Sequence, residues 1–235
     1  MKLHFFLLCF LVACGFVVAP YLIFFSAPVL PELGLIQKIF FFHVPSAWAM
    51  FLSAFVCAFG SAAFLFKRRR WGDELATAAA ELTVVFGVLV LTTGPLWARK
   101  AWGHYWEWDV RLTTVFILFL IFIAVLLARR YGGPASRRIA AGLALFGAAD
   151  VPLVYLSVKL WRTIHPKTTV VTSMHPDMRP AFFVSLTLFT LLYLVLLWIR
   201  LNLERSRGRL DALAVTLAER STLCTLRPPA PPDYR

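Results

Sequence analysis

Charged residues are scarce in this sequence. Asp, Glu, Lys and Arg make up only 15% of its 235 residues, whereas hydrophobic residues make up 60%. A soluble domain of this length needs more polar surface, so the composition excludes that class. Because a segment that crosses a bilayer must satisfy its backbone hydrogen bonds internally, an apolar chain of this kind is expected to be helical. We predict a single-domain, all-α integral membrane protein.

Motifs for thiol and nucleotide chemistry are also missing. The four cysteines form no CxxC pair, which argues against thiol redox chemistry and a thiolate metal site. The sequence contains no glycine-rich phosphate-binding loop, so any ATP hydrolysis must come from another chain. Residues 11–14 resemble a lipoprotein cleavage box, but the apolar run continues through Phe24 without a break. We therefore expect an uncleaved first helix.

Long apolar runs are what the sequence does contain. A bilayer core requires about 20 residues of helix, and the runs of suitable length number six: 3–25, 39–66, 75–96, 112–128, 139–160 and 181–199. We predict one transmembrane domain of six helices over residues 1–200. Residues 201–235 are predicted to form a basic, proline-rich tail that is poorly ordered apart from a short helix near 210–218.

Positive charge gathers between these runs rather than along them. Lys and Arg cluster at residues 67–70, 129–138 and 200–209. By the positive-inside rule these segments are cytoplasmic, which places both termini in the cytoplasm and residues 99–113 on the outer face. The net charge of +12 therefore reflects membrane orientation, and we expect no nucleic-acid partner.

Residues 102–109 read Trp-Gly-His-Tyr-Trp-Glu-Trp-Asp and hold three of the eight tryptophans. Arg99, Lys100 and Arg111 flank them. Interfacial tryptophans commonly anchor a helix end at the level of the lipid headgroups. A cluster with neighbouring arginines also suits a flat, apolar, acidic ligand, since aromatic faces stack on such a ligand and guanidinium groups bind its carboxylates. The residues alone leave both interpretations open.

Four of the five histidines fall on the outer side of the predicted topology. An isolated histidine in an outer loop is usually only a polar surface residue. Neutral imidazole is, however, a common axial ligand of haem iron, and two from separate loops are able to hold it from both faces. His43 lies at the outer start of the second run, and His165 just after the fifth. Their two loops are expected to meet over the tryptophan segment.

The pattern Trp102-Gly103-x-x-Trp106-x-Trp108-Asp109-x-Arg111 resembles the WWD signature of the haem-handling proteins of cytochrome c biogenesis. With the Phe-His-Val-Pro-Ser-Ala run at 42–47, the six spans and the length, residues 1–200 resemble one branch of them, the cytochrome c maturation protein C (haem exporter protein C) family. The resemblance implies a bacterial inner-membrane protein that binds haem b transiently on its periplasmic face. It also implies three partners: a periplasmic haem chaperone, an ABC-type ATPase with its membrane subunits, and a small single-span accessory subunit.

The resemblance implies that His43 and His165 are the axial ligands of the iron. The residues expected to form the haem platform are Trp102, Gly103, Trp106 and Trp108. Arg111 is expected to meet the propionates, and Asp109 to orient either Arg111 or the loop backbone. Candidates ranked below these are Arg99, Lys100, His104, Tyr105, Trp48, His175 and Asp150.

Three of the lower-ranked residues carry open alternatives. His104 falls on a variable position of the signature and is expected to be a rim contact rather than a spare ligand. His175 shares the loop of His165 but lies outside the resemblance, so we rank it lower. Asp150 lies within the fifth run, where a charge is costly. It has either a functional role or a structural one as a protonated or hydrogen-bonded acid beside Pro152.

Binding and delivery of haem is therefore the predicted function, without an enzymatic activity in this chain. One alternative is a haem lyase, which joins haem to apocytochrome c. The related lyases resemble longer chains with histidines inside the membrane, and this sequence has none mid-span. The other alternative is a transporter that moves haem across the bilayer, which calls for a polar route between helices. Only Asp150 and a few Ser and Thr residues offer one.

Overall fold

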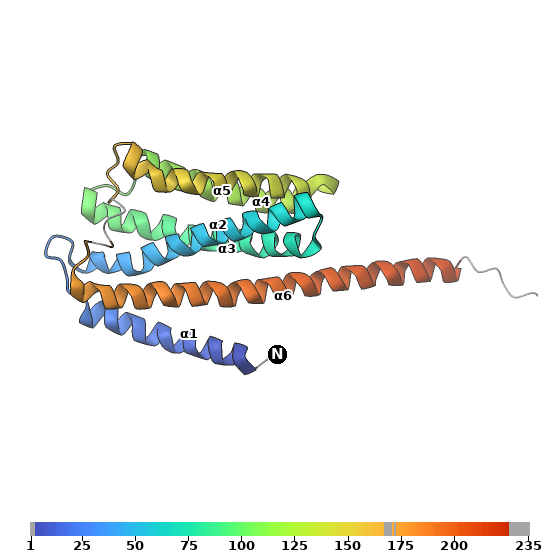
Figure 1. The fold of residues 1–235 in the computed structure, drawn as a ribbon, viewed down its shortest axis with the longest axis horizontal. Helices are drawn as coiled ribbons and strands as arrows, with labels where there is room; N and C mark the ends of the chain where they lie inside the picture. The colour runs from blue at the N-terminus through green and yellow to red at the C-terminus, as the bar shows by residue number, and fades with distance from the viewer. Residues whose placement is uncertain (1–2, 167–170, 172, 226–235) are drawn as a thin grey trace, which may run out of the picture.

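The computed structural model describes residues 3–166, 171 and 173–225, with side chains up to residue 219. Within these residues it contains helices and no strand. Six helical segments are long and apolar enough to cross a membrane, which confirms the predicted fold class. Their main helices are α1 (Leu3–Tyr21), α2 (Phe40–Lys67), α3 (Arg70–Trp102), α4 (Val110–Tyr131), α5 (Ser136–Leu160) and α6 (Arg179–Thr225) (Figure 1).

Short turns extend or connect the main helices. A π-helical turn, Leu22–Ser26, continues α1, and a 3-10 turn, Gly34–Ile39, leads into α2. Two more 3-10 turns, Gly133–Ala135 and Pro176–Met178, precede α5 and α6. The chain between the spans is therefore short, apart from the segments 103–109 and 161–175.

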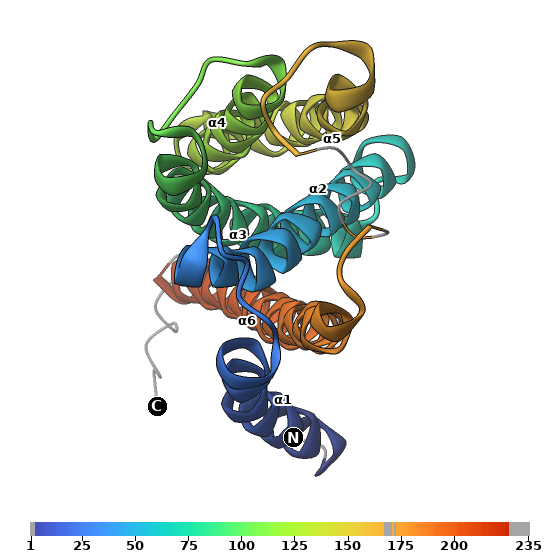
Figure 2. The same ribbon diagram turned by 90° about the vertical axis from the view of Figure 1, so that its left-hand side faces the viewer.

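Helices α2 and α3 form a closely packed antiparallel pair at the centre of the bundle. Two glycines allow the close approach: a Cβ on Gly60 would lie 2.6 Å from the carbonyl oxygen of Gly72. Small residues let membrane helices pack tightly, because the lipid gives no hydrophobic drive for their association. Helices α4 and α5 pack on one side of this pair, and α6 followed by α1 on the other (Figure 2).

The described ends of the chain, in α1 and α6, lie at the same end of the bundle as the basic segments (Figure 1). We call it the arginine end and define it by residues 67–70, 129–138 and 200–209. Ion pairs join helices there: Arg129 Nη1 lies 2.8 Å from Asp73 Oδ1, and Arg200 Nε lies 2.5 Å from Glu81 Oε2. The other end, where α3 ends and α4 begins, holds the site described below, and we call it the cavity end.

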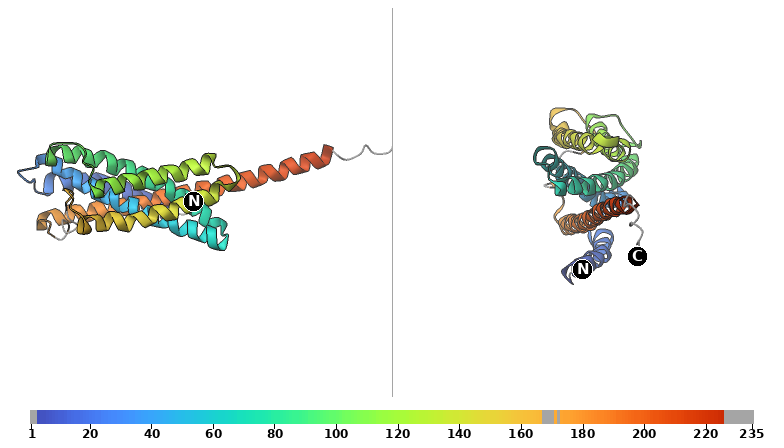
Figure 3. Two further views of the ribbon diagram at one scale, coloured as in Figure 1. Left: turned by 90° about the horizontal axis from the view of Figure 1, so that it is seen from above. Right: turned by 90° about the vertical axis from the view of Figure 1, so that its right-hand side faces the viewer.

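Helix α6 is longer than its apolar run predicts. It continues through residue 200 without a break and projects beyond the arginine end as far as Thr225 (Figure 3). The short helix predicted near 210–218 is therefore part of a single helix of 47 residues. The proline-rich stretch predicted for the tail lies outside the described residues.

Polar contacts hold the start of α2 at the cavity end. Pro45 has no N–H, so the carbonyl of Phe41 lacks its usual helical partner. The Ser185 hydroxyl of α6 donates a hydrogen bond to that carbonyl instead. Just before α2, the buried Lys38 donates to the Ala27 carbonyl at 2.5 Å. Helix α2 is thereby tied to α6 and to the segment that follows α1.

Candidate functional site

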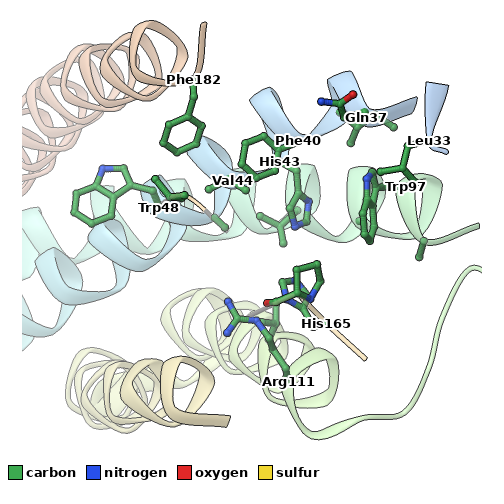
Figure 4. A pocket seen from close by; sticks show the side chains of 18 of the residues that line it. Leu33, Gln37, Phe40, His43, Val44, Trp48, Trp97, Arg111, His165 and Phe182 are labelled. Carbon is green, nitrogen blue, oxygen red and sulfur yellow. The ribbon is translucent and has the colours of Figure 1, made fainter. Parts of the chain in front are cut away.

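The cavity end contains a cavity of about 840 Å³. Small-molecule and cofactor sites typically occupy roughly 300 to 1,000 Å³ and are lined mainly by apolar and aromatic side chains. Side chains from α2, α3, α4, α5 and α6 form this cavity, together with residues of the segments that connect them (Figure 4). Five helices thus converge on one largely apolar site.

His43 points into this cavity from the second turn of α2 (Figure 4). Its Nδ1 lies 2.9 Å from Thr93 Oγ1 of α3. The Thr93 hydroxyl donates its own proton to the Leu89 carbonyl at 2.5 Å. With that proton directed at Leu89, the Thr93 oxygen is placed to accept from His43, an arrangement that favours a hydrogen on Nδ1. In the neutral ring this places the free lone pair on Nε2.

His165 lies on the other side of the cavity, opposite His43 (Figure 4). Its Nδ1 lies 3.0 Å from the Pro166 carbonyl oxygen, which only accepts hydrogen bonds, so Nδ1 carries a proton and the neutral ring has its lone pair on Nε2. Burial and the positive charge of Arg111 lower the pKa of His165 to about 4. The ring is therefore neutral at physiological pH, as a metal ligand must be.

Asp109 connects the tryptophan segment to the His165 segment. Its Oδ1 caps α4 by accepting a hydrogen bond from the Leu112 N–H at 2.8 Å. Its Oδ2 accepts from the Ile164 N–H at 3.2 Å and from the Thr163 hydroxyl. The Thr163 oxygen in turn accepts from the His165 N–H at 3.1 Å. Of the two predicted roles of Asp109, these hydrogen bonds match orientation of the loop backbone.

Arg111 follows in the first turn of α4 and lines the cavity near His165 (Figure 4). Its Nη1 donates to the Val154 carbonyl of α5 at 3.2 Å. This hydrogen bond anchors the guanidinium to α5, and because a guanidinium has five N–H groups, further donors are available to a ligand.

The three predicted platform tryptophans separate into two groups. Trp102, the last residue of α3, and Trp106 line the cavity. Trp108 is not among the lining residues, and it is 72% exposed while its ring makes an edge contact with Trp106 at 5.7 Å. Gly103 ends α3 with a φ of 85°, a left-handed conformation that favours glycine, and does not itself line the cavity. The expected three-tryptophan surface is thus only partly assembled.

Comparison with known proteins bears directly on this site. A family model described as "Heme exporter protein C" matches residues 2–216. The chain belongs to the heme exporter protein C family. It is 37% identical to "Heme exporter protein C" of Bradyrhizobium diazoefficiens over 193 residues, which are 80% of this chain and 73% of the relative.

More distant relatives agree with this assignment. The chain is 33% identical to "Heme exporter protein C" of Escherichia coli K12 over 187 residues, 75% of this chain and 73% of the relative. It is 31% identical to a "Putative cytochrome c biosynthesis ccmC-like mitochondrial protein" of Marchantia polymorpha over 184 residues, 76% of this chain and 79% of the relative. The resemblance identified from the tryptophan segment is therefore confirmed. The range matched to the heme exporter protein C family contains every residue that lines the cavity.

Three of the lower-ranked candidates also line the cavity: Trp48, Tyr105 and His175. His175 differs from the other two cavity histidines in its hydrogen bonding, since its Nδ1 accepts from the Asp177 N–H at 3.3 Å. The same nitrogen lies 3.6 Å from Asp177 Oδ2, and the His175 side chain is 58% exposed. His175 is therefore distinguished from His43 and His165 by its exposure and by its pairing with Asp177.

The remaining candidates do not line the cavity: Arg99, Lys100, His104 and Asp150. Arg99 donates to the Gly103 carbonyl and lies over the Tyr105 ring at 5.7 Å. His104 Nε2 lies 3.3 Å from Glu107 Oε2, an acid of the same segment. Asp150 Oδ2 is buried, and it has no hydrogen-bond partner among the described residues. Because Asp150 does not line the cavity, the cavity gives no support for a role of this residue in the site.

The sequence interpretation missed Trp97, Thr93 and Gly94. Trp97 lines the cavity, and its ring makes an edge-to-face contact with Trp102 at 5.4 Å (Figure 4). A signal for this face was present, because Val90, Gly94, Trp97 and Ala98 recur at the three- and four-residue spacing of one helix face.

Proposed function

We propose that this chain binds haem b in the cavity and delivers it to a periplasmic haem chaperone for cytochrome c maturation. One observation carries the proposal: His43 and His165, which are 122 residues apart in the sequence, lie in one cavity. Each has its Nδ1 engaged, and neither Nε2 has a hydrogen-bond partner among the described residues. Metal-binding histidines characteristically donate their second ring N–H to an oxygen, which fixes the ring and makes the ligand more basic. Bound haem would take an imidazole from each side.

The other cavity groups suit a porphyrin with two carboxylates. Trp97, Trp102 and Trp106 supply aromatic wall, and buried apolar area stabilises a complex by about 25 cal/mol per Å². Arg111 offers charge-assisted hydrogen bonds to a propionate. The Trp106 Nε1–H is buried without a partner among the described residues, so it is a second donor available to the ligand.

Delivery requires that bound haem remain reachable. The cavity lining includes Tyr105, which is 57% exposed, and the exposed Trp108 lies directly beside Trp106. We propose this rim, made by Tyr105 and Trp108, as the place where the chaperone docks. Membership of the family supports an ABC-type ATPase with its membrane subunits and a small single-span subunit as further partners.

We place the cavity end in the periplasm and the arginine end in the cytoplasm of a bacterial inner membrane. The support is the concentration of Lys and Arg at residues 67–70, 129–138 and 200–209. A reporter enzyme that is active only outside the cytoplasm should give signal when fused after Lys100 and none when fused after Arg69. The opposite pattern would put the cavity in the cytoplasm and eliminate delivery to a periplasmic chaperone.

The function is tested with protein purified from membranes of cells that also produce the chaperone. We expect the wild type to show the sharp visible bands of six-coordinate, low-spin haem and to capture the chaperone. Trp108→Ala is expected to retain its haem and to capture several-fold less chaperone, because Trp108 lies outside the cavity. Trp102→Ala is expected to lose haem, because Trp102 is part of the wall. Absorbance and immunoblotting measure the two quantities.

Trp71→Ala is the matched control, since Trp71 is a partly exposed tryptophan at the arginine end. It should leave both quantities unchanged. A wild-type protein that never carries haem, even when haem is supplied in excess, would refute binding. Capture of the chaperone at wild-type levels by Trp108→Ala would refute docking on this rim and leave binding intact.

A further inference from the structure

The imidazole of His43 lies against two consecutive residues of α3, Thr93 and Gly94. Thr93 Oγ1 lies 2.9 Å from His43 Nδ1. A Cβ built on Gly94 would lie 3.1 Å from His43 Cε1, which is tighter than ordinary van der Waals contact. Because residue 94 has no side chain, the ring lies close to the α3 backbone without being displaced, and its Nδ1 is within hydrogen-bonding distance of the Thr93 hydroxyl.

The direction of the hydrogen bond follows from the helix itself. The Thr93 hydroxyl donates to the Leu89 carbonyl one turn earlier at 2.5 Å, as threonines in helices often do. A hydroxyl has only one hydrogen to donate, so with that hydrogen directed at Leu89 the Thr93 oxygen is placed to accept from His43 Nδ1. Thr93 thus acts as a hydrogen-bond acceptor for His43, as the Pro166 carbonyl does for His165.

We propose that Thr93 is a positioning residue that fixes the Nδ1–H tautomer and the orientation of His43, so that Nε2 faces the iron. The proposal rests on the proposed function and extends it to a residue that does not touch the ligand. An acceptor on the ring nitrogen that does not bind the metal raises the basicity of a ligating histidine. Loss of such an acceptor typically weakens metal binding by about 10- to 100-fold. A more basic imidazole favours ferric iron, so Thr93 should lower the midpoint potential of bound haem.

The first test uses the haem-free protein, so it does not depend on haem binding. The full chain is labelled with ¹⁵N-histidine, and the His43 signals are identified by their absence in His43→Ala. In the wild type, His43 should show a protonated Nδ1 and an unprotonated Nε2. Thr93→Val, which keeps the shape and loses the acceptor, should give mixed tautomers, and Thr93→Ser should restore the wild-type pattern.

The second test uses haem-loaded protein. Thr93→Val should lose haem about tenfold faster to an acceptor in solution, with a raised midpoint potential and altered low-spin electron paramagnetic resonance signals. Thr93→Ser should match the wild type. Thr93→Ala takes the place of the valine variant if the latter does not accumulate in the membrane.

Thr92→Val is the matched control. Thr92 is the preceding residue of α3, is exposed, and donates to the Val88 carbonyl at 2.8 Å without lining the cavity. If Thr93→Val matches the wild type and Thr92→Val in tautomer, potential and haem loss, the proposal is wrong. That result would leave the haem site itself in place. A wild type without haem would instead overturn the proposed function, while the tautomer test would still decide the role of Thr93.

Discussion

His43→Ala and His165→Ala are each expected to lose the low-spin haem spectrum and to retain haem at least about tenfold less well than the wild type. The two rings approach the cavity from opposite sides, one from α2 and one from the segment after α5 (Figure 4). Without either one, bound haem would be held by the remaining histidine alone. The spectrum should then change to that of high-spin haem, and a stronger effect is expected for the double variant.

His175→Ala is the control for these two variants. His175 lines the same cavity, yet its side chain is 58% exposed and its Nδ1 is paired with Asp177, whose N–H lies 3.3 Å away. Its haem content and spectrum should stay within about twofold of the wild type, the scale of a lost rim contact. Absorbance spectra and haem assays on equal amounts of purified protein measure both effects. If His175→Ala abolishes the low-spin spectrum and His165→Ala does not, the ligand in this segment is His175.

The six spans were predictable from sequence because the constraint behind them is simple. A bilayer demands about 20 apolar residues per helix, and each predicted run coincides with one helical segment. The ends of the helices were harder to predict from the sequence. Span length says nothing about where a helix stops once it has left the lipid, and residues 200–219 are rich in Leu, Ala, Arg and Glu, which favour helix. The extension of α6 therefore follows from helix propensity rather than from hydropathy.

The site was predictable only in part, and the division follows secondary structure. Trp97 and Gly94 lie on a helix, where periodicity determines which residues share a face, so the pattern was available in the sequence. Trp106 and Trp108 lie in the irregular segment between α3 and α4, where spacing does not determine direction. One of them faces the cavity and the other faces outward. No sequence pattern predicts that His43 meets Thr93, because this contact depends on how α2 packs on α3.

Asp109→Asn is expected to have an effect as large as loss of a ligand, although Asp109 does not line the cavity. Asparagine caps a helix about as well as aspartate, so its side-chain oxygen can still accept from the Leu112 N–H. The second position of the carboxylate would then hold an NH₂ group, facing the Ile164 N–H that now donates at 3.2 Å. Two donors repel, so the segment that carries His165 is released while α4 keeps its cap.

We therefore expect Asp109→Asn to convert haem from the six-coordinate, low-spin form to a five-coordinate, high-spin form held by His43 alone. Haem retention should fall by about tenfold or more, with thermal stability close to that of the wild type. Asp109→Ala should lose haem similarly and also lose about 1 kcal/mol of stability with the helix cap. Visible spectra and thermal unfolding separate the two variants.

Glu107→Gln gives the matched comparison, since Glu107 is an exposed acid two residues away whose side chain lies 3.3 Å from His104. It removes the same negative charge from the same segment without touching the contacts of Asp109. If the effect came from net charge beside the cavity, Glu107→Gln and Asp109→Asn would behave alike. If Asp109→Asn kept the six-coordinate spectrum, His165 would be held by other contacts, and the link from Asp109 through Thr163 would serve only to order the loop.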